Sequence, residues 1–432
     1  MELPDRVIGG AYRFQAWETL ESLVDIGSRM AGSAGEQAAM ETIADALREA
    51  GARDVGVESF EFPGWERGDS ALSLPDRRYG GTHEVIALPG GPAGEVTAPL
   101  VDVGTGTPAE FEAADLEGKL ALVSSDTPED YGRWIHRREK YNAAIEAGAA
   151  GFLFRNHVPG CLPPTGDIGG RDGPRPVPGI GVSRELGKRL VRRRAREELS
   201  GTLQVDCRAE QMESGNVSGR LGPETDEMVL VTAHHDAHDI AEGARDNGAG
   251  CALVVEIARM LARAEEDLDV GVQLTTFGAE EVGLRGSRHH VEHAALDRVR
   301  AVVNCDAVGG SRDLAVHTNG FEGLPDPFER AADSLGVPVS IKPELAPHSD
   351  HWPFVRQGVP GVMAASDGSD DRGWGHTHGD TFDKLDRRNL REAAVPLAAA
   401  VLDIATGDPP ASRVDPAEIE RRAEQEEQVL DG

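Results

Sequence analysis

Short apolar runs alternate with one long amphipathic stretch between residues 227 and 305. The runs EMVLVTA (227–233), VGVQLTTF (270–277) and VRAVVNC (299–305) have the length and apolar content of buried strands. The stretch GCALVVEIARMLARAEE (250–266) repeats its apolar residues at the spacing of one helix face. Strands that alternate with helices predict an α/β fold, in which a mixed, mostly parallel sheet is flanked by helices.

The middle of the chain differs from its two ends in composition and in the length of its predicted elements. Residues 14–50 predict two helices joined by the loop GSRMAGSAGE, and the following VGVESFEF alternates like a strand. From about residue 75, proline and glycine become dense among short strands, and one clear helix, REKYNAAIEAGAAG, precedes the strand FLFRN. Frequent proline and glycine among short strands predict a separate β-rich module. We therefore expect four segments: a first part of one domain (1–80), an inserted domain (81–214), the second part of the first domain (215–408) and a charged tail (409–432).

The charge balance narrows the choice of partners. The 432 residues include 44 Lys+Arg and 75 Asp+Glu, which gives a net charge of −31. A field of that sign repels phosphate, so we expect neither nucleic acid nor an anionic membrane surface as a partner. The scarcity of lysine suggests a halophilic protein, a hypothesis that unfolding measured from low to molar KCl would test.

Features tied to cellular location are few. The opening MELPDRVIGG has no basic segment followed by an apolar one, so no signal peptide is expected and we predict a cytoplasmic protein. No apolar run reaches the roughly 18 residues of a membrane span. The four cysteines are widely separated and fit a reducing compartment.

Chemically active side chains follow the predicted strands. The first strand is followed by His234-His235-Asp236, the second by Glu280-Glu281 and the third by Asp306. The carboxyl ends of parallel strands meet at one edge of a sheet, so these groups are expected to converge there. The loops GARDNG (243–248) and GHTHGD (375–380) add further ligands. Histidine combined with carboxylates suits Zn²⁺, and so many carboxylates in one place favour two ions over one.

The ordered motifs resemble a known family. TAHHDAH, GARDNGAG, FGAEEVGLRGS, VVNCDAVGG and HTHGDT, preceded by GSRMAGSAGE, resemble the zinc peptidases of family M28. Residues 90–215, with DLEGKLALVSSD and NAAIEAGAAGFLF, resemble the protease-associated (PA) domain that is often inserted in these enzymes. The resemblance implies the zinc exopeptidase fold and covers almost the whole chain apart from the tail.

The resemblance also implies roles for single residues. His234 and Asp306 would bind one zinc ion, Glu281 and His376 the other, and Asp246 would bridge both. Glu280 would be the general base that acts on a hydroxide or water bridging the two ions, and Asp236 would hydrogen-bond the ring of His234. Two zinc ions per chain, a peptide substrate and a possible homodimer follow as expectations.

Departures from the family pattern leave some roles open. Arg245 stands where the family commonly has an acid, and it either pairs with a neighbouring acid or favours an anionic substrate group. His378 rivals His376 as a ligand, but the spacing of His376 to Asp380 matches the family. No tyrosine lies in the C-terminal region, so His348 or its neighbour His351 is a candidate for stabilising the oxyanion. The remaining histidines are expected to neighbour the ligand (His235, His238) or to lie on a solvated helix face (His289, His290, His293).

The sequence therefore predicts a di-zinc metallo-exopeptidase and favours an aminopeptidase over a carboxypeptidase. Three alternatives stay open: a carboxypeptidase of the same family, a single-zinc enzyme that cyclises N-terminal glutamine, and a non-catalytic, receptor-like scaffold. The two exopeptidases share the metal-binding residues and differ in the pocket that holds the substrate terminus, so motifs cannot separate them.

Overall fold

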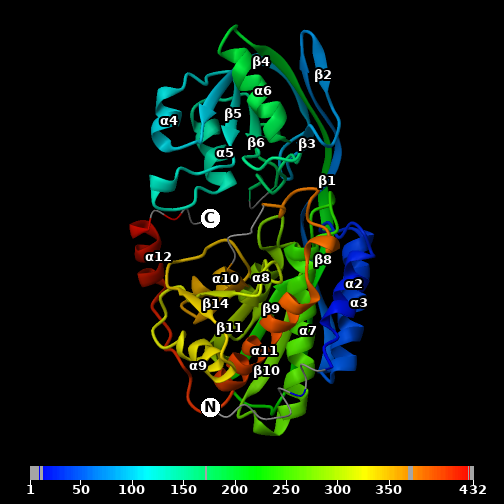
Figure 1. The fold of residues 1–432 in the computed structure, drawn as a ribbon, viewed down its shortest axis with the longest axis vertical. Coiled ribbons are helices and arrows are strands. Elements are labelled where there is room, and N and C mark those ends of the chain that lie inside the picture. The colour runs from blue at the N-terminus through cyan, green and yellow to red at the C-terminus, as the bar shows by residue number, and fades with distance from the viewer. Residues whose placement is uncertain (1–8, 10–12, 171–172, 368–372, 427, 429–432) are drawn as a thin grey trace. The chain divides into compact units, whose positions relative to one another are not determined.

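The computed structural model describes residues 13–170, 173–367 and 373–426, together with residues 9 and 428 (Figure 1). It divides into two compact units. Unit 1 comprises Met1–Phe62, Glu213–Asp371 and Asp380–Gly432, and unit 2 comprises Pro63–Met212 and Arg372–Gly379. Residues 1–8, on which the prediction about a signal peptide rests, lie outside the described residues.

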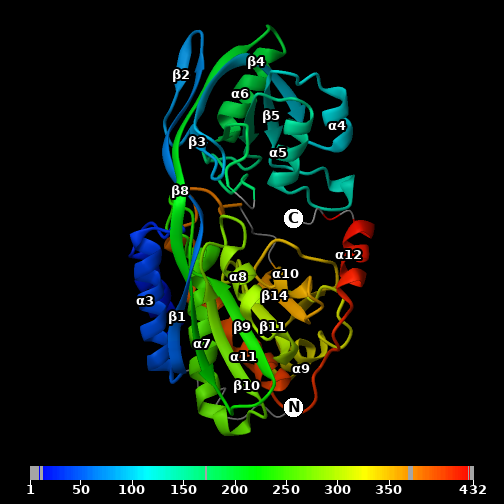
Figure 2. The same cartoon turned by 180° about the vertical axis from the view of Figure 1, so that it is seen from behind.

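Unit 1 contains the predicted mixed sheet. Its strand order is β13-β12-β14-β11-β9-β10-β8. The central pairs β10/β9, β9/β11 and β11/β14 are parallel, as is β12/β13, whereas β8 and β12 pair antiparallel with β10 and β14 (Figure 2). The bounds are Ser200–Leu221 (β8), Met228–His234 (β9), Gly271–Phe277 (β10), Val299–Cys305 (β11), Leu314–His317 (β12), Val339–Lys342 (β13) and Gly361–Ser366 (β14).

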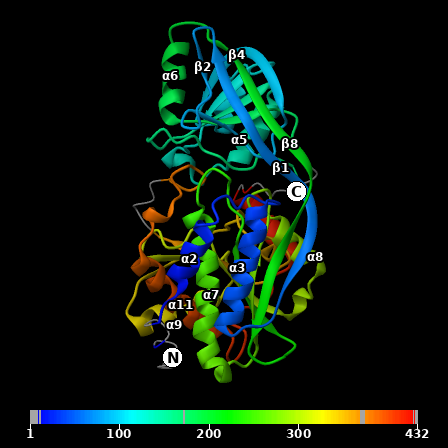
Figure 3. The ribbon, with the colours of Figure 1, turned by 90° about the vertical axis from the view of Figure 1, so that its right-hand side faces the viewer.

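Helices cover both faces of this sheet. On one face α7 packs against β9, β10 and β11 and α11 packs against β9 and β11, while α2 and α3 lie beside α7 (Figure 3). On the other face α8 contacts β10 and α10 contacts β14. The helices of unit 1 are α2 (Ala16–Val24), α3 (Ala34–Ala50), α7 (Ala249–Leu261), α8 (Arg285–His293), α9 (Asp326–Leu335), α10 (Trp352–Val355), α11 (Arg387–Ile404) and α12 (Pro416–Gln425).

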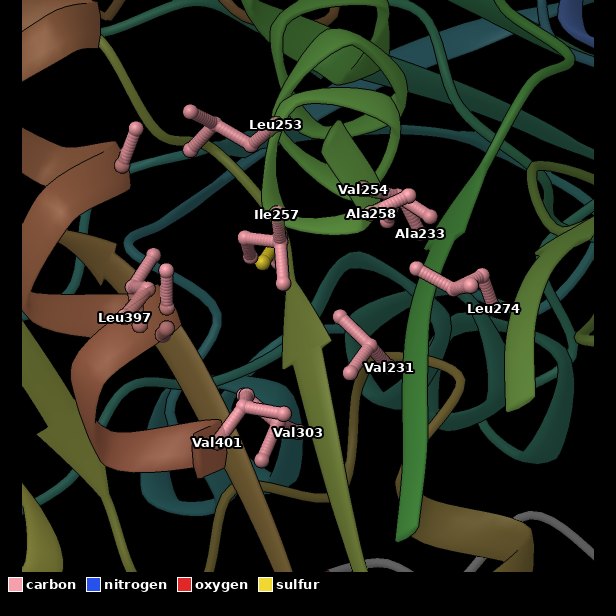
Figure 4. Close-up of a cluster of buried hydrophobic side chains, with 14 of the residues drawn as sticks. Val231, Ala233, Leu253, Val254, Ile257, Ala258, Leu274, Val303, Leu397 and Val401 are labelled. Atoms are coloured by element: carbon pink, nitrogen blue, oxygen red, sulfur yellow. The ribbon is translucent and has the colours of Figure 1, made fainter. Parts of the chain in front are cut away.

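Strand alternation assigns apolar side chains to the two faces. Val231 of β9 and Val303 of β11 join the cluster around Ile257 of α7 and Val401 of α11 (Figure 4). Their neighbours Leu230 and Val302 belong to a second cluster, together with Phe277 and Phe354. Because successive strand residues point to opposite faces, a strand covered on both sides is apolar throughout, as the sequence pattern predicted.

Unit 2 is a smaller layered body with its own core. Its strand order is β8-β4-β5-β6-β7-β3, with β4 to β7 parallel. Tyr141 and Phe152 pack together in the core between the sheet and α5. The elements are β1 (Arg53–Leu74), β2 (Arg77–Tyr79), β3 (Val85–Ala87), β4 (Gly94–Gly104), β5 (Leu120–Ser124), β6 (Gly151–Arg155), β7 (Gly179–Val182), α4 (Pro108–Ala113), α5 (Arg137–Glu146) and α6 (Arg184–Arg194).

The divisions between the units differ from the predicted boundaries. Strands β1 and β8 each contribute residues to both units, so the longer segment of unit 2 runs from Pro63 to Met212, whereas the sequence predicted an inserted domain from 81 to 214. A change of composition shows where loops become frequent along the chain. It cannot locate a division between units that falls inside a continuous strand. The predicted tail contains α12, whose Ile419 and Ala423 are fully buried in the main core.

A search of the helices in the described part of the chain finds none with the length and apolar character needed to span a bilayer.

Candidate metal centre

The candidate metal centre lies where the central strands of unit 1 end. His234 is the last residue of β9, Glu280 and Glu281 follow β10 closely, and Asp306 comes directly after β11. The parallel pairing of β10 and β11 with β9 brings these three ends to one edge, as predicted. We call this group, with Asp236 and Asp246, the acidic rim.

Three carboxylates surround one nitrogen of His234. The Nε2 atom lies 3.2 Å from Oδ1 of Asp246, 3.7 Å from Oδ1 of Asp306 and 4.0 Å from Oε2 of Glu280. Atoms bound tetrahedrally to zinc at about 2.1 Å lie about 3.4 Å from one another. The spacing of His234, Asp246 and Asp306 therefore suits a shared divalent cation.

The ring of His234 is oriented from its other nitrogen. Nδ1 lies 3.1 Å from the carbonyl oxygen of Asp236 and 3.5 Å from the Oδ1 atom of the same residue. The Asp236 carboxylate accepts hydrogen bonds from the backbone N–H groups of Glu280 at 3.0 Å and Glu281 at 3.1 Å. The expected contact of Asp236 with the His234 ring thus involves mainly its carbonyl, while its carboxylate fixes the loop that carries the two glutamates.

The pKa values of Glu280 and His234 are shifted because several acidic side chains are buried close together at the acidic rim. Burial raises the pKa of Glu280 well above its usual range, and the charges on Glu281, Asp350 and Asp306 raise it further against the opposing effect of His234. Burial opposes a charge on His234, yet Glu280 and the other facing carboxylates hold the pKa of the imidazole well above its ordinary value. Acids packed in this way are stabilised in the ionised state by a bound cation, so the residues of the acidic rim fit a metal.

Arg29, in the GSR segment, supports the loop that carries Asp246. Its guanidinium is fully buried and donates to the carbonyls of His235 at 3.0 Å, Glu242 at 2.6 Å and Gly243 at 2.9 Å. Gly243 has a φ of +57°, and a Cβ there would lie 2.3 Å from the Cβ of Ala237, so the loop requires glycine at this point. Arg29 therefore joins the end of β9 to the Asp246 loop.

Asp380 supports the same loop from the other side. Its two carboxylate oxygens accept the backbone N–H groups of Arg245 at 2.8 Å and Asp246 at 3.0 Å. Burial and the charge of Asp246 raise the pKa of Asp380 to about 7. The side chain of Arg245 has its Nε 3.5 Å from the carbonyl of Ala307.

Glu36 of α3 supports the glutamate loop. Its buried carboxylate accepts from the backbone N–H of Gly32 at 2.6 Å, the hydroxyl of Ser214 at 2.8 Å and the backbone N–H of Ala279 at 3.0 Å. Burial, followed by the charge of Asp236, raises the pKa of Glu36 to about 8. Ala279 directly precedes Glu280, so this contact sets where the proposed base stands.

A chain of polar side chains reaches Asp306 from the interior of the sheet. The hydroxyl of Ser349 donates to Oδ2 of Asp306 at 2.5 Å and accepts from the amide of Asn304 at 2.7 Å. The hydroxyl of Thr232 donates to the Asn304 amide oxygen at 2.8 Å. Asp306 is thus oriented by residues of β9 and β11 and by the loop before α10.

The expected second ligand pair divides between the two units. In unit 1, Nε2 of His238 lies 2.9 Å from Oε2 of Glu281, so His238 contacts a proposed ligand directly. His376 belongs to the segment 372–379 of unit 2, where its carbonyl accepts from the backbone N–H of Thr165 at 2.8 Å and its Nδ1 lies 3.4 Å from Nη1 of Arg137. His378, in the same segment, has Nε2 3.1 Å from the carbonyl of Thr82. The role of His376 as a ligand stays a prediction.

His348 and His351, the candidates for stabilising the oxyanion, lie within two residues of Asp350 in the sequence. His348 is half-buried, whereas His351 is fully buried and burial lowers its pKa to about 3. Asp350 is also fully buried, and burial raises its pKa to about 8. His351 is buried and weakly basic, so it is poorly suited to donate a proton to an oxyanion. His348 is therefore the better candidate of the two.

Sequence reasoning missed several supporting residues: Arg29, Glu36, Ser349 and Asp350. Arg29 and Glu36 are the two charged residues of the segment GSRMAGSAGE, whose other residues are mostly small. Charged residues are rarely buried unless they are paired, so the burial of these two indicates a supporting role.

Known proteins resemble this chain over nearly its full length. A family model described as "Peptidase family M28" matches residues 216–401, and a PA domain model matches residues 96–190. Aminopeptidase YwaD of Bacillus subtilis (strain 168) is 30% identical over 404 residues, which cover 90% of this chain and 84% of that protein. The chain therefore belongs to peptidase family M28, and it contains an inserted PA domain, as the motifs indicated.

Two further relatives show the breadth of the family. A zinc aminopeptidase from Bacillus subtilis, BSAP, has a solved structure with a TM-score of 0.71 and 28% identity, covering 92% of this chain and 96% of that one. Carboxypeptidase Q of Rattus norvegicus is 26% identical over 417 residues, which cover 92% of this chain and 86% of that protein. The predicted fold class is confirmed.

Proposed function

We propose that this chain is an aminopeptidase that depends on two zinc ions. The observation that carries the proposal is the position of His234, whose Nε2 faces Asp246, Asp306 and Glu280 within 4.0 Å. A histidine and carboxylates at such spacing match the donor set that zinc prefers. The aminopeptidase and zinc aminopeptidase among the relatives support the choice of metal and of reaction.

The proposed ligands divide between two ions. His234 and Asp306 would hold one ion, Glu281 and His376 would hold the other, and Asp246 would be shared by both. His238, whose Nε2 lies 2.9 Å from Oε2 of Glu281, contacts that carboxylate and limits its orientation. When bound, zinc supplies a Lewis acid that polarises the scissile carbonyl and makes water easier to deprotonate.

Glu280 is proposed as the residue that moves the proton. A carboxylate held ionised beside a bound cation can accept a proton from the attacking water and release it again. The same carboxyl group then donates this proton to the leaving amine. Asp236 keeps Glu280 in position through the hydrogen bond from the Glu280 backbone N–H.

The proposal is tested by the substitution Glu280→Gln. Glutamine keeps the shape of the side chain but cannot accept the proton, so hydrolysis of aminoacyl p-nitroanilides should fall about 10²- to 10⁴-fold. Zinc content, measured by elemental analysis, should stay unchanged. The matched control is Glu322→Gln, at an exposed position of unit 1, which should leave the rate unchanged. A Glu280→Gln enzyme with wild-type turnover would remove Glu280 from the mechanism.

A carboxypeptidase is the second candidate, favoured by the similarity to carboxypeptidase Q over 92% of the chain. The two activities are separated by blocking one end of the substrate. An aminopeptidase cleaves peptides with a free amino terminus and an amidated carboxyl terminus, and it leaves N-acetylated peptides intact. Release of the last residue from N-acetylated peptides would instead assign this chain to the carboxypeptidases.

A further inference from the structure

Helix α6 of unit 2 carries a row of positive charges, although the net charge of the chain is −31 (Figure 1). Leu186 and Leu190 are buried on the side of the helix that packs toward β4. Arg184, Lys188 and Arg192 are spaced four residues apart, so they form one line along the opposite side of the helix. Lys188 and Arg192 are exposed and Arg184 is half-buried. We call these three residues the basic row.

No acid pairs with the basic row. In the described part of the chain, no carboxylate oxygen lies within 4.0 Å of a side-chain nitrogen of Arg184, Lys188 or Arg192. Glu185 has the sequence spacing to pair with Lys188, but its two oxygens accept the backbone N–H groups of Gly160 at 2.9 Å and Cys161 at 3.0 Å. The single acid of α6 therefore contacts a loop and leaves the row positively charged.

Helix stability does not account for the basic row. Like charges four residues apart on a helix repel each other. Cations are also unfavourable at the amino-terminal end of a helix, and Arg184 is the first residue of α6. Charges on α12 are arranged differently, because Arg422 lies 3.7 Å from Glu426 of the same helix. The basic row destabilises its own helix, which indicates a use outside the fold of unit 2.

Other cations of α6 have structural contacts. A nitrogen of Arg193 lies 2.7 Å from the carboxylate of Asp76, in the turn before β2. The Nε atom of Arg194 donates to the carbonyl of Leu100 in β4 at 3.0 Å. These contacts attach the helix to its neighbours within unit 2, and they leave the basic row on the solvent side.

We propose that the basic row binds an acidic segment of another polypeptide in an extended conformation. Residues four positions apart on a helix are separated by about 6 Å along its axis. Alternate residues of an extended chain are separated by about 6.6 Å and point to the same side. A segment with Asp or Glu at every second position can therefore place one carboxylate beside each cation of the row.

Charge favours a short polypeptide segment over nucleic acid or a membrane. Exposed charges are screened beyond about 8 Å at physiological salt, so a ligand that contacts only the basic row is largely shielded from the other acids of the chain. A DNA duplex or an anionic bilayer extends far beyond one helix, and it meets the repulsion of a chain whose net charge is −31.

The proposal is tested with a labelled octapeptide of alternating glutamate and serine, whose ends are blocked so that an exopeptidase cannot cleave it. Fluorescence anisotropy in dilute salt measures its binding to the full chain. The double variant Lys188→Gln/Arg192→Gln should bind the octapeptide about 5-fold or more weakly than the wild type. The matched control Arg13→Gln/Arg391→Gln removes the same charge from exposed positions of unit 1 and should keep the wild-type affinity.

A charge reversal separates binding from a folding defect. Lys188→Glu/Arg192→Glu should bind an octapeptide of alternating lysine and serine more tightly than the control Arg13→Glu/Arg391→Glu does, and a misfolded variant would not gain such a partner. Equal affinities of the row variants and their controls for both peptides would overturn the proposal. Neither measurement needs zinc or hydrolysis, so the result is independent of the proposed peptidase activity.

Other occupants of the basic row are outcomes of the same test. A DNA duplex or phosphatidylserine vesicles that bind through these residues more tightly than the acidic octapeptide would assign the row to a different partner and overturn the proposal. A dimer of this chain that dissociates in Lys188→Gln/Arg192→Gln, while the wild type binds no octapeptide, would overturn it as well.

Discussion

Buried charges are balanced differently in the two units. In unit 2, the ammonium group of Lys140 donates to the carbonyls of Ser124 at 2.9 Å and Asp126 at 2.6 Å. Arg138 of the same unit pairs with Asp167 at 2.6 Å, and both side chains are largely buried. Each of these cations meets an acceptor within its own unit.

The acidic rim of unit 1 has the opposite balance. Glu280, Glu281 and Asp306 stand close together, and their mutual repulsion adds to burial in raising the pKa of Glu280. The fully buried Asp350 adds a further acid beside them. Both units end parallel strands with polar groups, so strand topology alone does not define a metal centre. What favours a metal centre is an excess of acidic groups over cationic partners, because the binding of a divalent ion then becomes favourable.

The largest expected effect comes from removing the carboxylate that both ions share. In Asp246→Asn the side chain keeps its size but loses its charge, so zinc content should fall by both ions and peptide hydrolysis should drop to background. Elemental analysis and an aminoacyl p-nitroanilide assay measure the two effects.

The control for this change is Asp333→Asn, an exposed aspartate on α9. It should retain wild-type zinc and activity. Retention of both ions by Asp246→Asn would contradict the shared role of Asp246.

The next effect concerns stability and tests the buried guanidinium of Arg29, which supports the rim loops. Arg29→Met removes the side-chain donors to the carbonyls of His235, Glu242 and Gly243, of which Gly243 keeps the backbone N–H of Gly248 as a donor. We expect the free energy of unfolding to fall by about 3 kcal/mol or more. Urea unfolding of the zinc-free protein measures it.

The matched control is Arg391→Met, on the exposed face of α11, which should change the free energy of unfolding by about 0.5 kcal/mol or less. Equal losses in the two variants would show that Arg29 is no more than a surface-like residue and that the rim loops need no internal cation.

The pH dependence of stability should have opposite signs in the two units. Burial lowers the pKa of Lys140 from 10.5 to about 8, so between these values the unfolded chain binds more protons than the folded one and stability rises with pH. Across that window the wild type should gain about 3 kcal/mol relative to Lys140→Met. For Glu36, burial raises the pKa from 4.5 to about 8, so the wild type should lose stability relative to Glu36→Gln as pH rises from 4.5 to 8.

Hydrogen exchange of peptides from each unit, followed in chelator over the two pH ranges, measures these differences. Curves for the wild type and Lys140→Met that stay parallel from pH 8 to 10.5 would show that burial does not lower the pKa of Lys140. A gain for Glu36 with rising pH would mean that its carboxylate is stabilised by a cation within the fold.

The smallest effect tests the residues behind Asp306. Ser349→Ala removes the hydroxyl that donates to Asp306 and accepts from Asn304, so zinc affinity should fall about 10- to 100-fold while the fold is kept. Competition with a chromogenic chelator measures the affinity. Ser340→Ala, on the edge strand β13, is the control, and an equal affinity in both variants would remove Ser349 from the support of the metal centre.

The sequence predicted the strands and the acidic rim more fully than the residues that hold the rim loops in place. Apolar runs ended by His234, Glu280 or Asp306 give the sheet edge directly, because parallel strands align their carboxyl ends. The contacts of Arg29 with His235 and of Glu36 with Ala279 join residues more than 200 positions apart, and no local pattern encodes them. The division at Pro63 was also hidden, because β1 continues through it as one strand.

The central claim is that the acidic rim binds two ions through one shared carboxylate. Crystals grown with zinc and measured on both sides of the zinc absorption edge test it most directly, because anomalous scattering locates each ion. The account predicts two peaks in the rim, each about 2.0–2.2 Å from an oxygen of Asp246. A single peak, or a rim filled by solvent alone, would contradict it.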